Sequence, residues 1–205
     1  MSTTLTFAGY DLTFAGNMLV HNAGTTVIGG RTYKTVIIGS QEWLAENLDY
    51  AFTTTYTDSW YSYYDNDEST YKSKGLLYNH YAATDLQQNR ATLCPGWHLP
   101  TVAEFETLIS YIGNDAGKKL KSTTGWLDDG NGTDEYGFNG QPSGYYNYGG
   151  SGYVGIESQV KYWTQNSYSN TERYTRVLLY NNDSFVSGLM DKLSRCSIRL
   201  IKDSV

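Results

Sequence analysis

A rigid corner that leads into a capped helix is the feature that most constrains this chain. Residues 93–100 read Leu-Cys-Pro-Gly-Trp-His-Leu-Pro, so two prolines bracket a tryptophan and a histidine. Thr101 and Glu104 follow in the spacing of a capping box, which predicts that a helix begins there. Four apolar residues then recur at helical spacing, namely Phe105, Leu108, Ile109 and Ile112. Gly113 ends the pattern, so the segment predicts a tight corner and a short core helix.

The rest of the chain indicates an α+β fold. We expect a strand at 33–38, helices at 77–86 and 101–112, and irregular glycine-rich chain from 113 to 155. Short antiparallel strands should follow at 162–164, 174–179, 184–187 and 196–201. In the last of these, one face carries Cys196, Ile198 and Leu200, and the other carries Ser197 and Arg199.

Several blocks resemble, in order, those of one protein family. They are residues 31–47, 75–78, 81–83, 120–126, 131–138, 142–145, 162–164 and 197–199, together with the corner at 93–100. The set is similar to the Fibrobacter succinogenes major paralogous domain family. This resemblance implies a C-type lectin-like fold with two helices, short antiparallel sheets and long loops rich in glycine and tyrosine. It implies much less about function, because such a scaffold carries many activities.

We expect the chain to have two parts, a strand-like attachment or oligomerisation segment at 1–30 and the lectin-like domain at 31–205. Leu-Thr-Phe-Ala-Gly occurs at 5–9 and again at 12–16, and each copy alternates apolar and polar residues like a brief strand. Two such strands cannot fold alone. They either add to the sheet of the main domain or pair with another chain, which would make a homo-oligomer.

Charge and hydropathy exclude some partners. The chain has 205 residues, a net charge of −6 and a pI near 5.0, which argues against a nucleic-acid partner. No apolar run approaches the length that crosses a bilayer, so we expect no membrane insertion. The first residues, Met-Ser-Thr-Thr-Leu-Thr-Phe, have neither the basic start nor the apolar core of a signal peptide. We expect a phage virion protein, carried on the tail, or a bacterial cell-surface protein whose signal was removed.

The tryptophans and cysteines predict features of the core. The four tryptophans that lie in family-like blocks should be buried: Trp43, Trp97, Trp126 and Trp163. The resemblance implies a disulfide between the Cys-Pro corner and a terminal strand, but Leu200 occupies the second position here. We therefore expect Cys94 and Cys196 to be free, buried thiols.

No catalytic arrangement can be argued from spacing. His21, His80 and His98 are scattered, and no Ser-His-Asp or Cys-His pattern accompanies them. The calcium-dependent sugar site of lectins would need a carboxylate at Ser143 and an Asn-Asp pair at Thr164. Residues 128–134 are rich in oxygen ligands but are more typical of a hydrogen-bonded turn. We expect no enzyme activity, no cofactor and no metal; the alternative is a cysteine- or metal-dependent enzyme.

A tyrosine-rich region is the best candidate for binding. Residues 145–185 hold eight tyrosines among many Asn, Ser, Thr and Gly, which is the composition of an antibody-like binding surface. Alternatively, these tyrosines are structural and stabilise the loops. Strand alternation and turn positions predict one exposed ligand-binding surface, formed by Tyr162, Thr164, Asn166, Tyr168, Asn170, Arg173, Tyr174, Tyr180, Asn182 and Asp183.

These expectations point to a non-enzymatic ligand- or receptor-binding protein, whose ligand would be a cell-surface protein or a glycan. Segments 168–171 and 180–184 resemble the variable regions of diversity-generating retroelement target proteins, in which mutated adenines scatter asparagine codons. That resemblance implies a phage tail-tip receptor-binding protein. The alternatives are a bacterial cell-surface adhesin and a pilus-associated assembly subunit.

Overall fold

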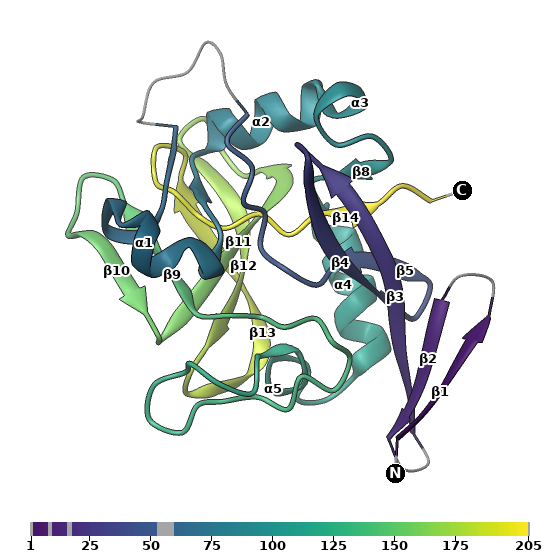
Figure 1. Ribbon diagram of the computed structural model, residues 1–205. Helices are drawn as coiled ribbons and strands as arrows, with labels where there is room; N and C mark the ends of the chain where they lie inside the picture. The colour runs from purple at the N-terminus through teal and green to yellow at the C-terminus, as the bar shows by residue number, and fades with distance from the viewer. Residues whose placement is uncertain (1, 8–9, 16–17, 53–59, 205) are drawn as a thin grey trace.

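The computed structural model describes residues 2–7, 10–15, 18–52 and 60–204, with side chains from residue 24 onward (Figure 1). Within these residues the fold is α+β. One sheet has the order β1-β2-β3-β4-β5-β14-β8. Its strands are β1 (Ser2–Phe7), β2 (Tyr10–Ala15), β3 (Met18–Ile28), β4 (Arg31–Ile38), β5 (Gln41–Leu44), β14 (Ile201–Lys202) and β8 (Trp97–His98).

A second sheet has the order β10-β9-β11-β12-β13, and a small ribbon pairs β6 with β7. These strands are β6 (Tyr61–Ser62), β7 (Leu77–Tyr78), β9 (Ser143–Asn147), β10 (Gly152–Ile156), β11 (Gln159–Ser167), β12 (Glu172–Leu179) and β13 (Asn182–Asp191). The helices are η1 (Tyr64–Asn66), α1 (Glu68–Tyr71), η2 (Lys72–Lys74), α2 (His80–Gln88), α3 (Arg90–Leu93), α4 (Val102–Ile112) and α5 (Ala116–Leu120).

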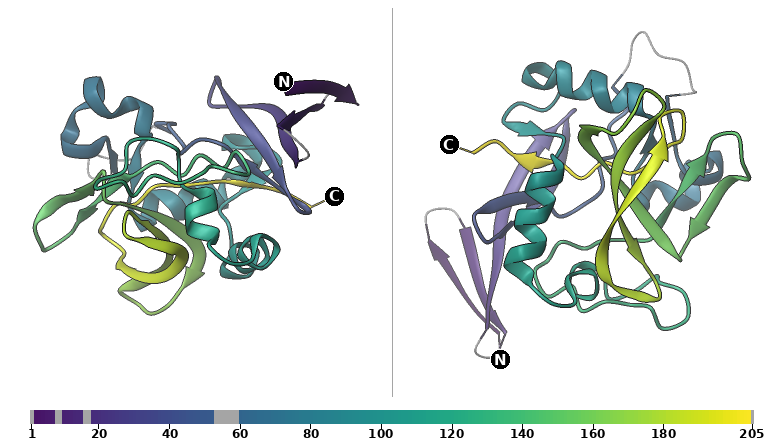
Figure 2. Two further views of the ribbon diagram at one scale, coloured as in Figure 1. Left: turned by 90° about the horizontal axis from the view of Figure 1, so that it is seen from below. Right: turned by 180° about the vertical axis from the view of Figure 1, so that it is seen from behind.

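The core lies between the two sheets, with α4 packed between them (Figure 2). Phe105 and Leu108 of α4 join one apolar cluster with Trp43 of the first sheet and Phe185 of the second. A neighbouring cluster surrounds Trp163 beneath α2. Trp43, Trp97, Trp126 and Trp163 are all at most 5% exposed, so the prediction that they are buried is confirmed.

The corner and the helix that follows it form as expected. Thr101 Oγ1 accepts a hydrogen bond from the Glu104 amide at 3.1 Å, and Glu104 Oε2 accepts one from the Thr101 amide at 2.8 Å. This reciprocal pair is a capping box, which satisfies amides that the first helical turn leaves without partners. Gly113 ends the helix with a φ of 74°, a conformation that glycine adopts without a Cβ penalty.

The expected helix at 77–86 begins later than the sequence suggested. Leu77 and Tyr78 pair with β6 as strand β7, and α2 begins only at His80. Asn79 is the physical reason, because its side chain caps the helix by accepting a hydrogen bond from the Ala82 amide at 2.9 Å.

Two other expectations need correction. The stretch from 113 to 155 is not wholly irregular, since it contains α5, β9 and most of β10. In the expected strand at 196–201, only Ile201 belongs to a strand, and residues 196–200 run through the centre with isolated bridges at Cys196 and Ser197. All five of those residues are buried, because the chain is covered on both sides there.

Residues before Gly29 extend the first sheet. The β3 strand pairs with β4 through the Gly29–Gly30 turn, and β2 and β1 continue the sheet outward (Figure 1). In this chain they therefore add to the sheet of the main domain. A separate role in joining copies of the chain stays a prediction.

Cys94 and Cys196 are free and buried, which confirms that prediction. Among the described residues, no helix has the length and apolar character needed to cross a membrane.

Candidate functional site

The ten predicted binding residues do not form one exposed surface. Tyr162, Thr164 and Arg173 are at most 3% exposed, so the expectation that they face solvent is wrong. Strand alternation failed because the middle of β11 is covered on both faces. Tyr162 packs edge-on against Phe138 and Phe185, while the adjacent Trp163 is buried in the other core cluster.

Arg173 is buried against α2. Its Nη1 donates hydrogen bonds to His80 Nδ1 at 2.5 Å and to Thr84 Oγ1 at 3.1 Å, and its Nη2 donates to the Gln165 carbonyl at 2.8 Å. Burial lowers the pKa of Arg173 to about 10. Burial, together with the charges of Arg173 and Lys192, lowers the pKa of His80 to about 4. His80 is therefore a neutral acceptor at pH 7, and the pair fastens α2 to β12.

The other seven predicted residues divide between two turns. Asn166, Tyr168, Asn170 and Tyr174 lie at or beside the turn between β11 and β12, whereas Tyr180, Asn182 and Asp183 lie at the turn between β12 and β13. Turns of successive hairpins alternate between the two ends of a sheet, so these two turns lie at opposite ends of β12, whose eight residues span about 26 Å. One small site cannot contain both, and a binding role for either group stays a prediction.

Arg199 joins several of the family-like blocks at one buried point. Its guanidinium donates hydrogen bonds to the carbonyls of Leu44, Phe138 and Asn139, to Asn47 Oδ1 and to the hydroxyl of Tyr162. The residue has no exposed surface, and burial lowers its pKa against the opposing effect of Tyr162 and Asp134. Arg199 therefore holds the blocks around residues 44–47, 138–139 and 162 together.

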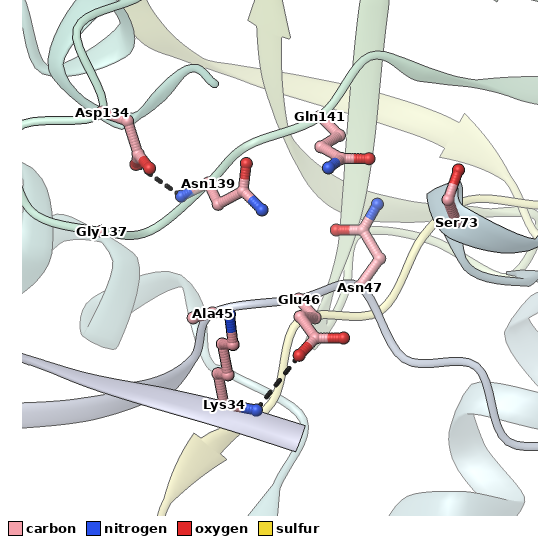
Figure 3. A pocket seen from close by; sticks show the side chains of 9 residues that line it. All are labelled: Lys34, Ala45, Glu46, Asn47, Ser73, Asp134, Gly137, Asn139 and Gln141. Atoms are coloured by element: carbon pink, nitrogen blue, oxygen red, sulfur yellow. Dashed lines mark hydrogen bonds between the residues drawn. The ribbon is translucent and has the colours of Figure 1, made fainter. Parts of the chain in front are cut away.

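A polar pocket of about 510 Å³ lies next to this arginine (Figure 3). It is lined by Lys34, Ala45, Glu46, Asn47, Ser73, Asp134, Gly137, Asn139 and Gln141. Asn47 is fixed on both sides, because its Oδ1 accepts from Arg199 and its Nδ2 donates to the Lys74 carbonyl at 2.9 Å. Asp134 Oδ1 accepts from the Asn139 amide at 2.6 Å, and burial raises the pKa of Asp134 to about 6.

A second hollow, which we name the aromatic cleft, has a volume of about 430 Å³. It is lined by Trp60, Asn79, Tyr81, Tyr146, Tyr148, Leu193 and Arg195. Tyr81, Tyr148 and Leu193 are 46%, 53% and 38% exposed, so large apolar surface faces solvent there. Arg195 is the charged member of the lining, and its guanidinium lies 4.6 Å from the centre of the Tyr146 ring.

Backbone pairing makes the frame of the aromatic cleft rigid. Tyr146 and Arg195 exchange two backbone hydrogen bonds, at 2.9 and 3.0 Å. The Tyr148 amide donates to Ser194 Oγ at 3.0 Å, and the Asn79 amide donates to the Trp60 carbonyl at 2.8 Å. Segments from four parts of the sequence are thus held together, so the backbone that carries these rings needs little ordering when a ligand binds.

Sequence reasoning singled out the region of Tyr146 and Tyr148 but missed Trp60 and Tyr81. One signal was available for Trp60, because it is the fifth tryptophan of the chain and lies outside the four blocks that bury the others. No local pattern marks Tyr81 as exposed, because the sequence predicted a helix from residue 77 whereas α2 begins at His80.

Within the part of the chain that the structure describes, no three His, Cys, Asp or Glu side chains form a group that could hold a metal ion. The oxygen-rich segment 128–134 uses two of its side chains to hold turns. Asn131 Oδ1 accepts from the Trp126 amide at 3.0 Å, and Asp134 accepts from Asn139 as described above.

Comparison with known proteins identifies the family. No curated protein and no solved structure gives a significant match to this chain. A family model described as the Fibrobacter succinogenes major domain matches residues 36–202, which include the corner, Arg199 and every residue that lines the polar pocket except Lys34. The chain therefore belongs to the Fibrobacter succinogenes major domain family.

Proposed function

We propose that this protein is a non-enzymatic binding module with a C-type lectin-like fold, and that the aromatic cleft binds an extended segment of a partner protein. The observation that carries the proposal is the exposure of Tyr81, Tyr148 and Leu193 around one rigid hollow. Soluble proteins rarely leave large apolar side chains exposed together unless the patch binds something. Exposed tyrosines also offer contact area at a small entropic cost.

The chemistry of the lining favours a peptide over a glycan. Most of the cleft surface is aromatic or aliphatic, which suits the apolar side chains of a peptide better than the many hydroxyls of a sugar. Aromatic-lined grooves suit extended, proline-containing chain, because that conformation needs no internal hydrogen bonds and is already ordered. Arg195 is cationic and the described residues that line the cleft include no carboxylate, so the preferred segment is neutral or acidic.

Selection of peptides from a displayed library, followed by affinity measurement on the best proline-containing sequence, tests this function. Tyr81→Ala and Tyr148→Ala should each weaken binding by about 2 kcal/mol or more, because exposed aromatic anchors dominate such interfaces. Thermal melting should stay unchanged, since both rings are about half exposed.

Tyr168→Ala is the matched control, because Tyr168 is 55% exposed at the turn between β11 and β12. It should bind the selected peptide like the parent protein. If Tyr168→Ala abolishes binding while Tyr148→Ala does not, the hairpin turn and not the aromatic cleft is the binding site. Failure to select any peptide would contradict the proposal outright.

We further propose display on a phage tail or on a bacterial cell surface, with diversification of the exposed turns at 168–171 and 180–184. Support comes from their asparagine- and tyrosine-rich sequences and from the exposure of most of these residues. Sequencing the locus in related isolates tests it. Changes confined to asparagine-derived positions between 145 and 187 would support diversification, and a uniform spread of changes would exclude it.

A further inference from the structure

We propose that the polar pocket beside Arg199 binds a neutral monosaccharide unit through its hydroxyl groups, without a metal ion. This site is independent of the aromatic cleft, because the two sets of lining residues share no member. Several polar groups reach into the pocket, and few of them are already hydrogen-bonded.

Three lining side chains extend their polar ends into the pocket, namely Lys34, Asn139 and Gln141 (Figure 3). Within the described part of the chain, none of these three polar ends forms a hydrogen bond or an ion pair. They contrast with Asn47 behind them, whose amide is used on both sides. The pocket therefore combines one fixed wall, at Asn47, with polar groups that remain available to a ligand.

The mixture of groups suits hydroxyls better than ions. Lys34 and the two amides donate hydrogen bonds, while Glu46 and Asp134 accept them, and a hydroxyl does both. Lys34 would repel a metal cation, and the two carboxylates would repel an anion. An apolar ligand would strip water from these groups without replacing their hydrogen bonds. The pocket volume of about 510 Å³ leaves room for one sugar ring.

Glu46 is already oriented for this role. Its Oε2 accepts from Arg31 Nη2 at 2.9 Å and its Oε1 accepts from the Lys34 amide at 3.2 Å. The carboxylate is thus held and partly neutralised before a ligand arrives. Preorganised groups of this kind lose less entropy on binding.

Saturation-transfer NMR with a panel of methyl glycosides of neutral hexoses and N-acetylhexosamines, at millimolar concentration and in the presence of EDTA, tests the proposal. At least one glycoside should bind. Gln141→Ala and Asn139→Gly should each weaken it about tenfold, the effect of losing a hydrogen bond in a site with charged groups. Glycine is chosen at Asn139 because the residue has a φ of 51°.

Tyr148→Ala is the control, since it removes a ring from the aromatic cleft and should leave glycoside binding unchanged. Melting curves should show that Gln141→Ala and Asn139→Gly remain folded. If one variant is unfolded, glycoside binding by the other variant tests the proposal. Three results would overturn the proposal: no glycoside binds, EDTA removes binding, or both pocket variants bind like the parent. Preferential binding of free glycine or alanine in the same assay would instead assign the pocket to a zwitterion and also overturn it.

Discussion

The guanidinium of Arg199 donates a hydrogen bond of 2.5 Å to Oδ1 of Asn47, although the two residues are 152 positions apart. Asn47 ends the Leu-Ala-Glu-Asn block, and Arg199 lies in the last block of the family match. The bond therefore joins the beginning and the end of the domain. It also fixes one wall of the polar pocket, so the same contact serves both stability and the proposed site.

Replacement of Arg199 by methionine should destabilise the protein by about 3–5 kcal/mol, because each buried acceptor that is left without a donor costs about 1–3 kcal/mol. Stability falls because the carbonyls of Leu44 and Phe138 would lose the hydrogen bonds that the Arg199 guanidinium donates to them. Chemical denaturation measures it. Arg90→Met is the control, because Arg90 forms a surface pair with Asp203 and should cost no more than about 1 kcal/mol. Equal costs for the two variants would show that the buried network contributes little.

A histidine held between two carboxylates should make stability depend on pH. His98 Nε2 lies 2.8 Å from Glu104 Oε1, and its Nδ1 lies 2.7 Å from Asp203 Oδ1. The hydrogen bond with Glu104 raises the pKa of His98 above 6.5, and the hydrogen bond with Asp203 raises it further. The folded state therefore holds this proton more tightly than the unfolded chain does. The resulting stabilisation is complete below pH 6.5 and is lost as pH rises through the raised pKa.

Melting of the parent and of His98→Gln across this pH range measures the effect. The parent should be the more stable at pH 6, and the difference should shrink as the medium becomes alkaline. His80→Gln is the control, because a pKa near 4 keeps His80 neutral throughout and its replacement should not change the slope. A constant difference between parent and His98→Gln would show that the histidine is not charged in the folded state.

Local patterns predicted the elements that local chemistry determines. The capping box at Thr101 and Glu104 and the stop at Gly113 are decided within one helix, and both are confirmed. Tertiary contacts decided the rest. Tyr162 and Thr164 occupy alternate positions of a strand, yet both are buried, because β11 is covered on both faces: Tyr162 packs in the cluster that contains Phe105 of α4, and Trp163 packs in the cluster beneath α2. The alternation of side chains along a strand predicts which residues are exposed only where one face of the sheet is open to water.

The aromatic cleft shows the same limit for sites. Its rings come from residues 60, 81, 146 and 148, and the tyrosine-rich composition of the sequence marked only the last two. They meet because Tyr146 pairs with Arg195 and because Asn79 pairs with Trp60. Neither pairing is accompanied by a periodic pattern of residues in the sequence. The polar pocket, by contrast, draws several residues from blocks that the sequence already marked.

The two thiols should be inert in the folded protein. Cys94 and Cys196 are 0% exposed, and burial raises the pKa of each to about 12. The reactive thiolate is therefore scarce at neutral pH. Iodoacetamide should label neither residue under native conditions and both in denaturant, as mass spectrometry would show, and a reducing agent should leave the melting midpoint unchanged. Rapid labelling of the native protein would mean that one thiol is accessible.

Trp97 should be a principal anchor of the corner. Its indole is 3% exposed, and Nε1 donates to Thr26 Oγ1 at 3.1 Å, so it connects the corner to β3. Trp97→Ala should cost about 3–5 kcal/mol, because the lost apolar contacts leave a cavity. Trp97→Phe fills more of that space and should cost less, although it also loses the hydrogen bond, worth about 0.5–1.5 kcal/mol. Thermal and urea unfolding measure both variants.

Val27→Ala, at a 62% exposed position on the same strand as Thr26, is the control and should stay within about 0.5 kcal/mol of the parent. An unchanged midpoint for Trp97→Ala would contradict the corner as a buried anchor, and equal losses for the alanine and phenylalanine variants would assign the effect to the Thr26 hydrogen bond and not to packing.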